Sequence, residues 1–174
     1  NIHQRYNPRL AYISYSVQDT LRGMHLSKYS KHVTVIHGKI YDVMCDLRAD
    51  SPTFRRWAVV ELTQDNKQQV FIPAGVAHGF YCIENATVLY LQGGVFNPPE
   101  EVDLNPFDSY LGILWQKPFA SYIISKKDQE SQSFFQLHPT FSNSLPLRRV
   151  LVIGASGQVG RAIVELYGQC NVVG

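Results

Sequence analysis

The stretch from Thr20 to Arg48 mixes ionisable residues into apolar runs. It holds two arginines, three histidines, three lysines and two aspartates. The apolar residues between them alternate as in a β-strand, where successive side chains point to opposite faces. Histidine is a base near neutral pH, and lysine or arginine can stabilise developing negative charge or a phosphate. In a barrel or sandwich, inward-facing strand positions can bring such groups together in a cavity rather than a hydrophobic core.

The elements that would hold these groups are short β-strands. From Val33 to about Gly94, apolar and β-branched runs recur between turns: HVTVI, KIYDVMCDL, RWAVVELT, QVFIPAG and ATVLYLQGG. Several short strands at such intervals are typical of an all-β sandwich or barrel. Residues 99–137 are interrupted by three prolines, so we expect loops and an edge strand that close one end of the domain.

The composition changes at residues 138–149, HPTFSNSLPLRR, which have the Pro, Ser and Asn content of a linker. The next run, VLVIGASGQVGRAIVELYG, reads as a buried strand, a glycine turn and a helix, as at the start of a dinucleotide-binding domain. Its turn glycines are Gly154, Gly157 and Gly160. One β-α unit cannot bury its own faces. We therefore expect residues 150–174 to be the truncated start of a Rossmann-like reductase domain, with an incomplete cofactor site that binds no NAD(P).

Composition limits the class of protein. The 174 residues are 45% hydrophobic, enough for one well-buried domain with a small appendage. The net charge is +2 without single-sign runs, which argues against nucleic-acid and membrane partners. Cys45, Cys82 and Cys170 form no C-x-x-C pair, so a reduced, cytoplasmic setting fits. The first residues lack an apolar signal region, and Asn1 at the start is compatible with a fragment.

Four strings resemble, in order, the motifs of the dTDP-4-dehydrorhamnose 3,5-epimerase family. They are the opening stretch, DLRADSPTFRRW, VFIPAGVAHGF and ISKKD, and the resemblance covers roughly residues 12–137. It implies a cupin-type jelly-roll β-sandwich for residues 1–137, a homodimer, no metal, no cofactor, and a nucleotide-linked 4-keto-6-deoxy sugar as substrate. The C-terminal fragment resembles the first β-α unit of a dTDP-4-dehydrorhamnose reductase, of the extended short-chain dehydrogenase type.

The resemblance also implies catalytic roles. A ketone at C4 acidifies the hydrogens on C3 and C5, so inversion needs a base on one face, an acid on the other and a cation near the enolate oxygen. By resemblance, His25 is the base and Asp128 orients its imidazole. Tyr90 donates a proton from the opposite face. Lys31 stabilises the enolate, with Lys28 as a competing candidate.

Substrate contacts follow from the same resemblance. Arg22 is the stronger candidate for the diphosphate, because guanidinium pairs bidentately with phosphate, whereas Arg48 is as compatible with a structural bond to Asp46 or Asp42. The other candidates are His78, Gln18, Phe96, Glu101 and Lys127. His78 lies in P-x-G-x-x-H, which resembles half of a metal-cupin signature, but H-x-H is missing. We therefore expect His78 to contact the sugar or the enolate oxygen rather than a metal.

Two departures from the family leave details open. The segment VQDTLRG is shorter than in the family, which shifts Gln18 relative to the family's motif. Val95-Phe96 replaces a tyrosine pair of the family, which bears on the nucleotide base. The prediction is a metal-free 3,5-epimerase of nucleotide-rhamnose biosynthesis, fused to or cooperating with an NAD(P)-dependent reductase. A single-centre epimerase and a non-catalytic nucleotide-sugar-binding cupin that scaffolds the reductase remain as alternatives, and dTDP and UDP are not distinguished.

Overall fold

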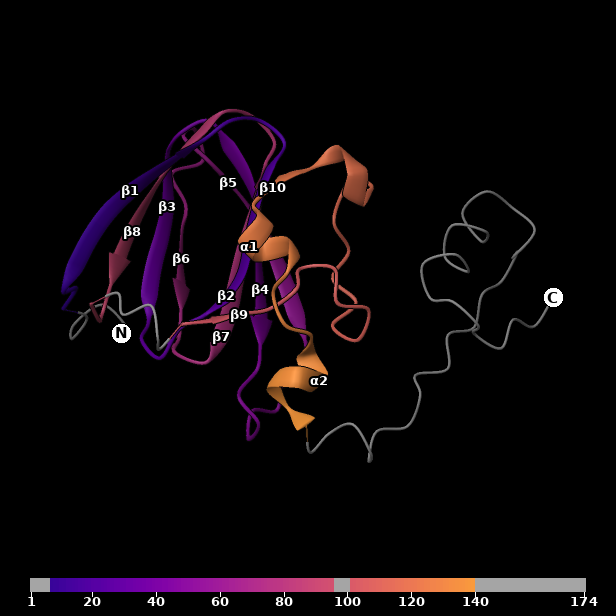
Figure 1. Ribbon diagram of the computed structural model, residues 1–174. Coiled ribbons are helices and arrows are strands. Elements are labelled where there is room, and N and C mark those ends of the chain that lie inside the picture. The colour runs from indigo at the N-terminus through magenta and orange to yellow at the C-terminus, as the bar shows by residue number, and fades with distance from the viewer. Residues whose placement is uncertain (1–6, 96–100, 140–174) are drawn as a thin grey trace. The chain divides into compact units, whose positions relative to one another are not determined.

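The computed structural model describes residues 7–95 and 101–139 (Figure 1). The chain divides into two compact units, Asn1–Phe134 and Phe135–Gly174, and every described strand belongs to the first. The expected Rossmann-like fragment at residues 150–174, including Gly154, Gly157 and Gly160, lies outside the described residues. Most of the expected linker lies outside them as well.

Short strands dominate the first unit, as the sequence predicts. They are β1 (Leu10–Ser16), β2 (Thr20–Leu26), β3 (Lys31–His37), β4 (Lys39–Asp46), β5 (Trp57–Thr63), β6 (Gln69–Ile72), β7 (Val76–Cys82), β8 (Ala86–Gln92), β9 (Val102–Asp103) and β10 (Ile123–Ile124). A 3₁₀ turn occupies Phe119–Ser121, and the helices α1 (Lys126–Gln129) and α2 (Phe134–Leu137) have four residues each. None of the described helices has the length and apolar character needed to cross a membrane.

Two sheets are formed by these strands. One has four antiparallel strands in the order β1-β8-β3-β6, and the other has the order β10-β2-β7-β4-β5 with β9 paired to β2. Residues of both sheets share one core that includes Val33, Ile40, Leu62, Phe80 and Val88. In β8, buried and half-buried residues alternate, as expected for a strand with one face on that core.

The second face of the larger sheet is covered by the segment between β9 and β10. Leu21, Tyr81 and Tyr122 are buried there against Phe107 and Trp115. As a result all seven residues of β7 are buried, which removes the alternation that marks a strand with one exposed face. The expected edge strand exists as β10, and Phe107, Trp115 and Tyr122 of the preceding segment pack against the sheet.

Candidate active site

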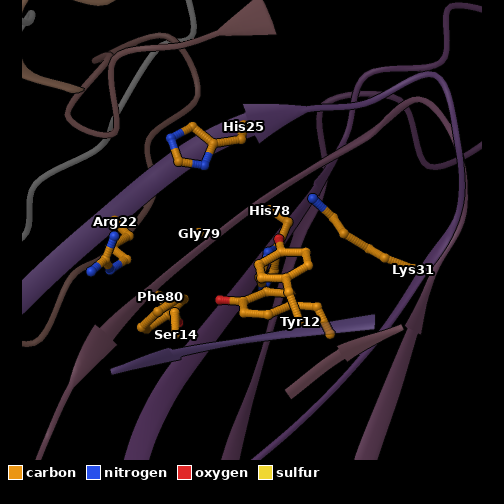
Figure 2. A pocket seen from close by; sticks show the side chains of 9 residues that line it. Tyr12, Ser14, Arg22, His25, Lys31, His78, Gly79 and Phe80 are labelled. Carbon is orange, nitrogen blue, oxygen red and sulfur yellow. The ribbon is translucent and has the colours of Figure 1, made fainter. Parts of the chain in front are cut away.

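A cavity of about 140 Å³ is formed by residues of both sheets (Figure 2). The larger sheet contributes residues of β2 and β7, and the smaller sheet contributes residues of β1, β3 and β8. The lining consists of Tyr12, Ser14, Arg22, His25, Lys31, His78, Gly79, Phe80 and Tyr90. The structure thus brings five of the sequence-predicted site residues to one cavity.

A β-bulge in β2 turns Arg22 and His25 toward this cavity. Residues three apart on a regular strand point to opposite faces. The β2–β7 pairing shifts its register between Arg22 and His25, where two residues of β2 lie opposite Gly79 alone. The bulge needs glycine, because Gly23 has a φ of +119° and a Cβ there would lie 2.6 Å from the Cα of Gly79.

His25 and Asp128 form a hydrogen-bonded pair. His25 Nε2 lies 2.9 Å from Asp128 Oδ1, and Asp128 is only 4% exposed. Asp128 sits in α1, whose N-cap Ser125 accepts a hydrogen bond from the Asp128 backbone N–H. Burial alone would raise the pKa of Asp128, but the bond from His25 and the nearby N–H of Gly23 bring the pKa below its ordinary value. With Nε2 bound to a carboxylate, Nδ1 is the His25 nitrogen available as a base.

A second carboxylate lies beside this pair. Asp103 Oδ1 is 3.6 Å from His25 Nε2, and Asp103 Oδ2 is 3.0 Å from the ammonium nitrogen of Lys127. The ligand-type atoms of His25, Asp103 and Asp128 lie within 4.8 Å of one another. The sequence-predicted substrate contact Lys127 thus pairs with a protein carboxylate, and it does not line the cavity.

His78 faces the cavity from β7 and has a buried carboxylate behind it. Its Nε2 lies 2.8 Å from Asp42 Oδ1, although the two groups are not aligned as a hydrogen bond. Burial lowers the pKa of His78, and Asp42 opposes that shift in part. His78 is therefore a neutral imidazole at neutral pH, able to act as a polar contact without carrying charge.

Lys31, the first residue of β3, supplies a buried cation at the cavity. It is only 5% exposed, and burial lowers its pKa to about 8, against the opposing effects of Glu101 and Asp42. Lys31 is mostly protonated at pH 7, and it lacks the full hydration that would weaken its field. A desolvated ammonium of this kind can stabilise an anionic oxygen placed beside it.

Tyr90 contributes a protonated hydroxyl from β8. It is 6% exposed, and burial raises its pKa, so the phenol keeps its proton throughout the neutral range. Its ring stacks on that of Tyr12 in β1, with centroids 4.6 Å apart and an interplanar angle of 7°. The Tyr12 hydroxyl accepts a hydrogen bond from the buried Gln92 side chain. Tyr90 is thus fixed between Tyr12 and the core.

The remaining predicted contacts fall into three groups. Arg22 lines the cavity and donates a hydrogen bond to Ser16 Oγ at 2.8 Å. Arg48 lies outside it and binds Asp46 through two nitrogens at 2.9 and 2.8 Å, which is the structural alternative noted from the sequence. Gln18, Glu101 and Lys127 are not among the lining residues. Phe96 lies outside the described residues.

Four residues with polar side chains at or beside the cavity were not predicted from the sequence. Tyr12 and Ser14 alternate along β1, so the pattern YISYS carried a period-two signal that points both toward one face. Asp42 was noted only as a partner for Arg48, and it meets His78 across neighbouring strands. Asp103 gave no local signal, because its position depends on a two-residue strand pairing with β2.

Fold and site together define a protein of two β-sheets with titratable side chains gathered in a cavity between them. The sequence profile of the dTDP-4-dehydrorhamnose 3,5-epimerase family matches residues 4–136, and the chain belongs to that family.

Individual relatives agree with this placement. The chain is 34% identical over 126 residues to a dTDP-4-dehydrorhamnose 3-epimerase of Streptomyces niveus, covering 70% of this chain and 60% of the relative. It is 30% identical over 164 residues to a 3,5-epimerase of Streptomyces griseus, covering 87% of this chain and 81% of that protein. A Legionella pneumophila 3,5-epimerase crystallised with dTDP-4-keto-L-rhamnose superimposes with a TM-score of 0.69 at 33% identity, covering 73% and 69% of the two chains.

Proposed function

We propose that this protein epimerises a nucleotide-linked 4-keto-6-deoxyglucose at C3 and C5, in nucleotide-rhamnose biosynthesis. The observation that carries the proposal is the division of the site between the sheets. The His25–Asp128 pair belongs to the larger sheet and its flanking helix, and Tyr90 belongs to the smaller sheet. A sugar ring in the cavity would meet a base on one face and an acid on the other, which inversion of a carbon requires.

The reaction uses these groups in order. Nδ1 of His25 takes the proton from the carbon next to the ketone, and the electron pair of that C–H bond moves into an enolate. Asp128 stabilises the imidazolium, and Lys31 and His78 stabilise the enolate oxygen. Tyr90 then donates its hydroxyl proton to the opposite face of the carbon, and the ketone re-forms. Solvent returns a proton to Tyr90 and takes the proton from the His25 imidazolium, which restores both groups. A second cycle inverts the other carbon.

Arg22 is the group that best fits the diphosphate. It lies at the cavity on β2, and its second guanidinium nitrogen makes only a long 3.4 Å contact to the Tyr15 carbonyl, so it can reach a phosphate oxygen. The dTDP-sugar bound to the Legionella relative supports a nucleotide sugar as the ligand class. We propose dTDP or UDP as the carrier.

The test is solvent deuterium incorporation into the 4-keto sugar, located by NMR. We expect label at both C3 and C5. Label at one carbon supports a single-centre epimerase, the activity named for the Streptomyces niveus relative. Absence of label, with the ligand still bound, supports a non-catalytic nucleotide-sugar-binding scaffold. His25→Ala should abolish both exchanges and preserve binding, because one base serves both carbons.

We further infer that two copies of the chain pair in the cytoplasm and work with an NAD(P)-dependent reductase, fused or separate. Pairing is supported by β1, an edge strand of the smaller sheet, where Ile13 and Tyr15 are 62% and 59% exposed. Apolar edge strands are seldom left to solvent. Analytical ultracentrifugation should give a dimer mass, and Ile13→Lys should shift it to the monomer. The reductase is supported by the sequence of residues 150–174, and NADPH oxidation coupled to formation of the epimerised 4-keto sugar tests for it.

A further inference from the structure

We propose that Asp103 is a second carboxylate for the catalytic base, sharing with Asp128 the task of positioning the His25 imidazole. The inference rests on the proposed role of His25. It makes Asp103 a positioning residue, because Asp103 contacts the ring and does not line the cavity.

Backbone pairing fixes Asp103 in place. In the β2–β9 ladder, Asp103 is the register partner of His25. The next residue, Leu104, exchanges two backbone hydrogen bonds with Met24 at 3.0 and 2.8 Å and is completely buried. The carboxylate of Asp103 is therefore held beside the imidazole by main-chain pairing at Val102, Asp103 and Leu104.

The two oxygens of Asp103 have different surroundings. Oδ2 is bound to Lys127 at 3.0 Å. Oδ1 is shielded from solvent, accepts no hydrogen bond from the described residues, and lies 3.6 Å from His25 Nε2. That distance is too long for a hydrogen bond, but a small tilt of the ring would close it. The Nε2–H of His25 thus has two acceptors within reach, one engaged and one vacant.

The charges around His25 give a reason for a second carboxylate, that of Asp103. On the cavity side, His25 shares its lining with the cations Arg22 and Lys31 and with the imidazole of His78. On the other side lie Asp128, Asp103 and Lys127. With neutral His25, these three groups and the ring carry a net negative charge, and proton uptake by His25 neutralises it. Asp103 therefore offsets the cavity cations when the base is protonated.

A double-mutant cycle tests this sharing. Because either carboxylate can hold Nε2–H, Asp103→Asn alone should slow deuterium wash-in only about threefold, and Asp128→Asn alone should slow it roughly 30-fold. The double variant should slow deuterium wash-in about 1,000-fold or more, because neither acceptor then remains ionised. That effect is well over the product of the two single effects. Multiplicative effects of the two changes would overturn the proposal. Melting curves confirm that each variant is folded.

Adjacent lysines provide a matched control. Lys127→Met removes the partner of Asp103, so it should change wash-in in the parent and have no further effect in Asp103→Asn. Lys126→Met removes the same charge from the next position, where the side chain is 84% exposed and pairs with Glu130, and it should change nothing. If Lys127→Met changes the wash-in rate as much in Asp103→Asn as in the parent, the effect of Lys127 does not depend on Asp103.

A readout without substrate separates this proposal from the proposed function. Nitrogen NMR of the ligand-free protein should show the Nε2–H tautomer of His25 in the parent and in Asp128→Asn, and its loss in the double variant. A tautomer unaffected by Asp103 overturns the positioning role. If the tautomer depends on Asp103 and the parent shows no deuterium exchange, the positioning role stands and the epimerase function fails.

Discussion

His78 and Asp42 meet at 2.8 Å in the interior, where their side chains are 4% and 0% exposed. Burial keeps His78 neutral, so the buried Asp42 carboxylate has no full charge directly against it. Asp42 also raises the pKa of Lys31, against the larger effect of burial. Asp42 thus acts on the electrostatics of two cavity residues, His78 and Lys31.

Asp42→Asn should narrow the pH range of activity. Burial lowers the pKa of Lys31 to about 8, and Asp42 opposes that shift. Without the carboxylate, the Lys31 ammonium loses its proton at a lower pH, and the alkaline fall of kcat/KM, expected near pH 8 in the parent, should move toward neutrality. The pH dependence of kcat/KM measures this. Glu61→Gln, which removes an exposed carboxylate bound to Lys39, should leave the profile in place.

Lys31→Met should stabilise the protein while it abolishes turnover. The pKa of Lys31 falls from 10.5 in the unfolded chain to about 8 in the folded one. Between these values the unfolded state binds more protons, so the free energy of unfolding of the parent rises with pH from about 8 to about 10.5. Below that window the full cost applies, and Lys31→Met should gain about 3 kcal/mol at pH 7. Urea denaturation at pH 7 and pH 10 checks this, and an equal gain at both would contradict it.

Tyr90→Phe should separate proton exchange from inversion. The variant keeps the ring that stacks on Tyr12 and loses only the acid, so His25 still forms the enolate. Solvent then returns a proton only to the face that the base has left. Deuterium should enter the substrate at a rate within about threefold of the parent, while inversion falls about 100-fold or more. If both rates fall together, the donor lies elsewhere, and Tyr12 and His78 are the neighbours to test.

Chelator treatment should leave epimerisation unchanged, because each proposed step uses protein acids, bases and cations. The assay is the initial rate before and after dialysis against EDTA, with metal content measured in both samples. Loss of activity that zinc or another divalent ion restores would contradict the prediction. It would direct attention to His25, Asp103 and Asp128, whose ligand-type atoms lie within 4.8 Å of one another.

The strands with one face on the core could be predicted from the sequence, and those without that pattern could not. HVTVI and ATVLYLQGG alternate, and both are strands in the structure as β3 and β8. β7 was not recognised as a strand of its own, because it is buried along its whole length and its pattern is continuous. β1 was missed because its alternation is inverted: the large Ile13 and Tyr15 are exposed, whereas Ser14 and Ser16 lie on the inner face.

The candidate site likewise contains residues that could be predicted from the sequence and residues that could not. His25 and Asp128 lie 103 residues apart, and only the resemblance to a family joined them before the structure did. Arg48 illustrates the opposite case: its type suited a phosphate, yet Asp46 lies two residues away and takes both of its guanidinium bonds. His25 in β2 and Asp103 in β9 lie 78 residues apart in the sequence, and strand pairing brings them together. No local sequence pattern predicts such a pairing.

The division of the site between two sheets makes its width a property of the architecture. Packed β-sheets keep a separation of about 10 Å, which depends on the side chains that interdigitate between them. Here those include Val33, Leu62 and Val88, none of which lines the cavity. Replacing a lining residue changes which atoms of a ring are touched, whereas the thickness of ring that fits is set by the interior. Selection for substrates of another thickness would therefore act on core residues remote from any contact with the ligand.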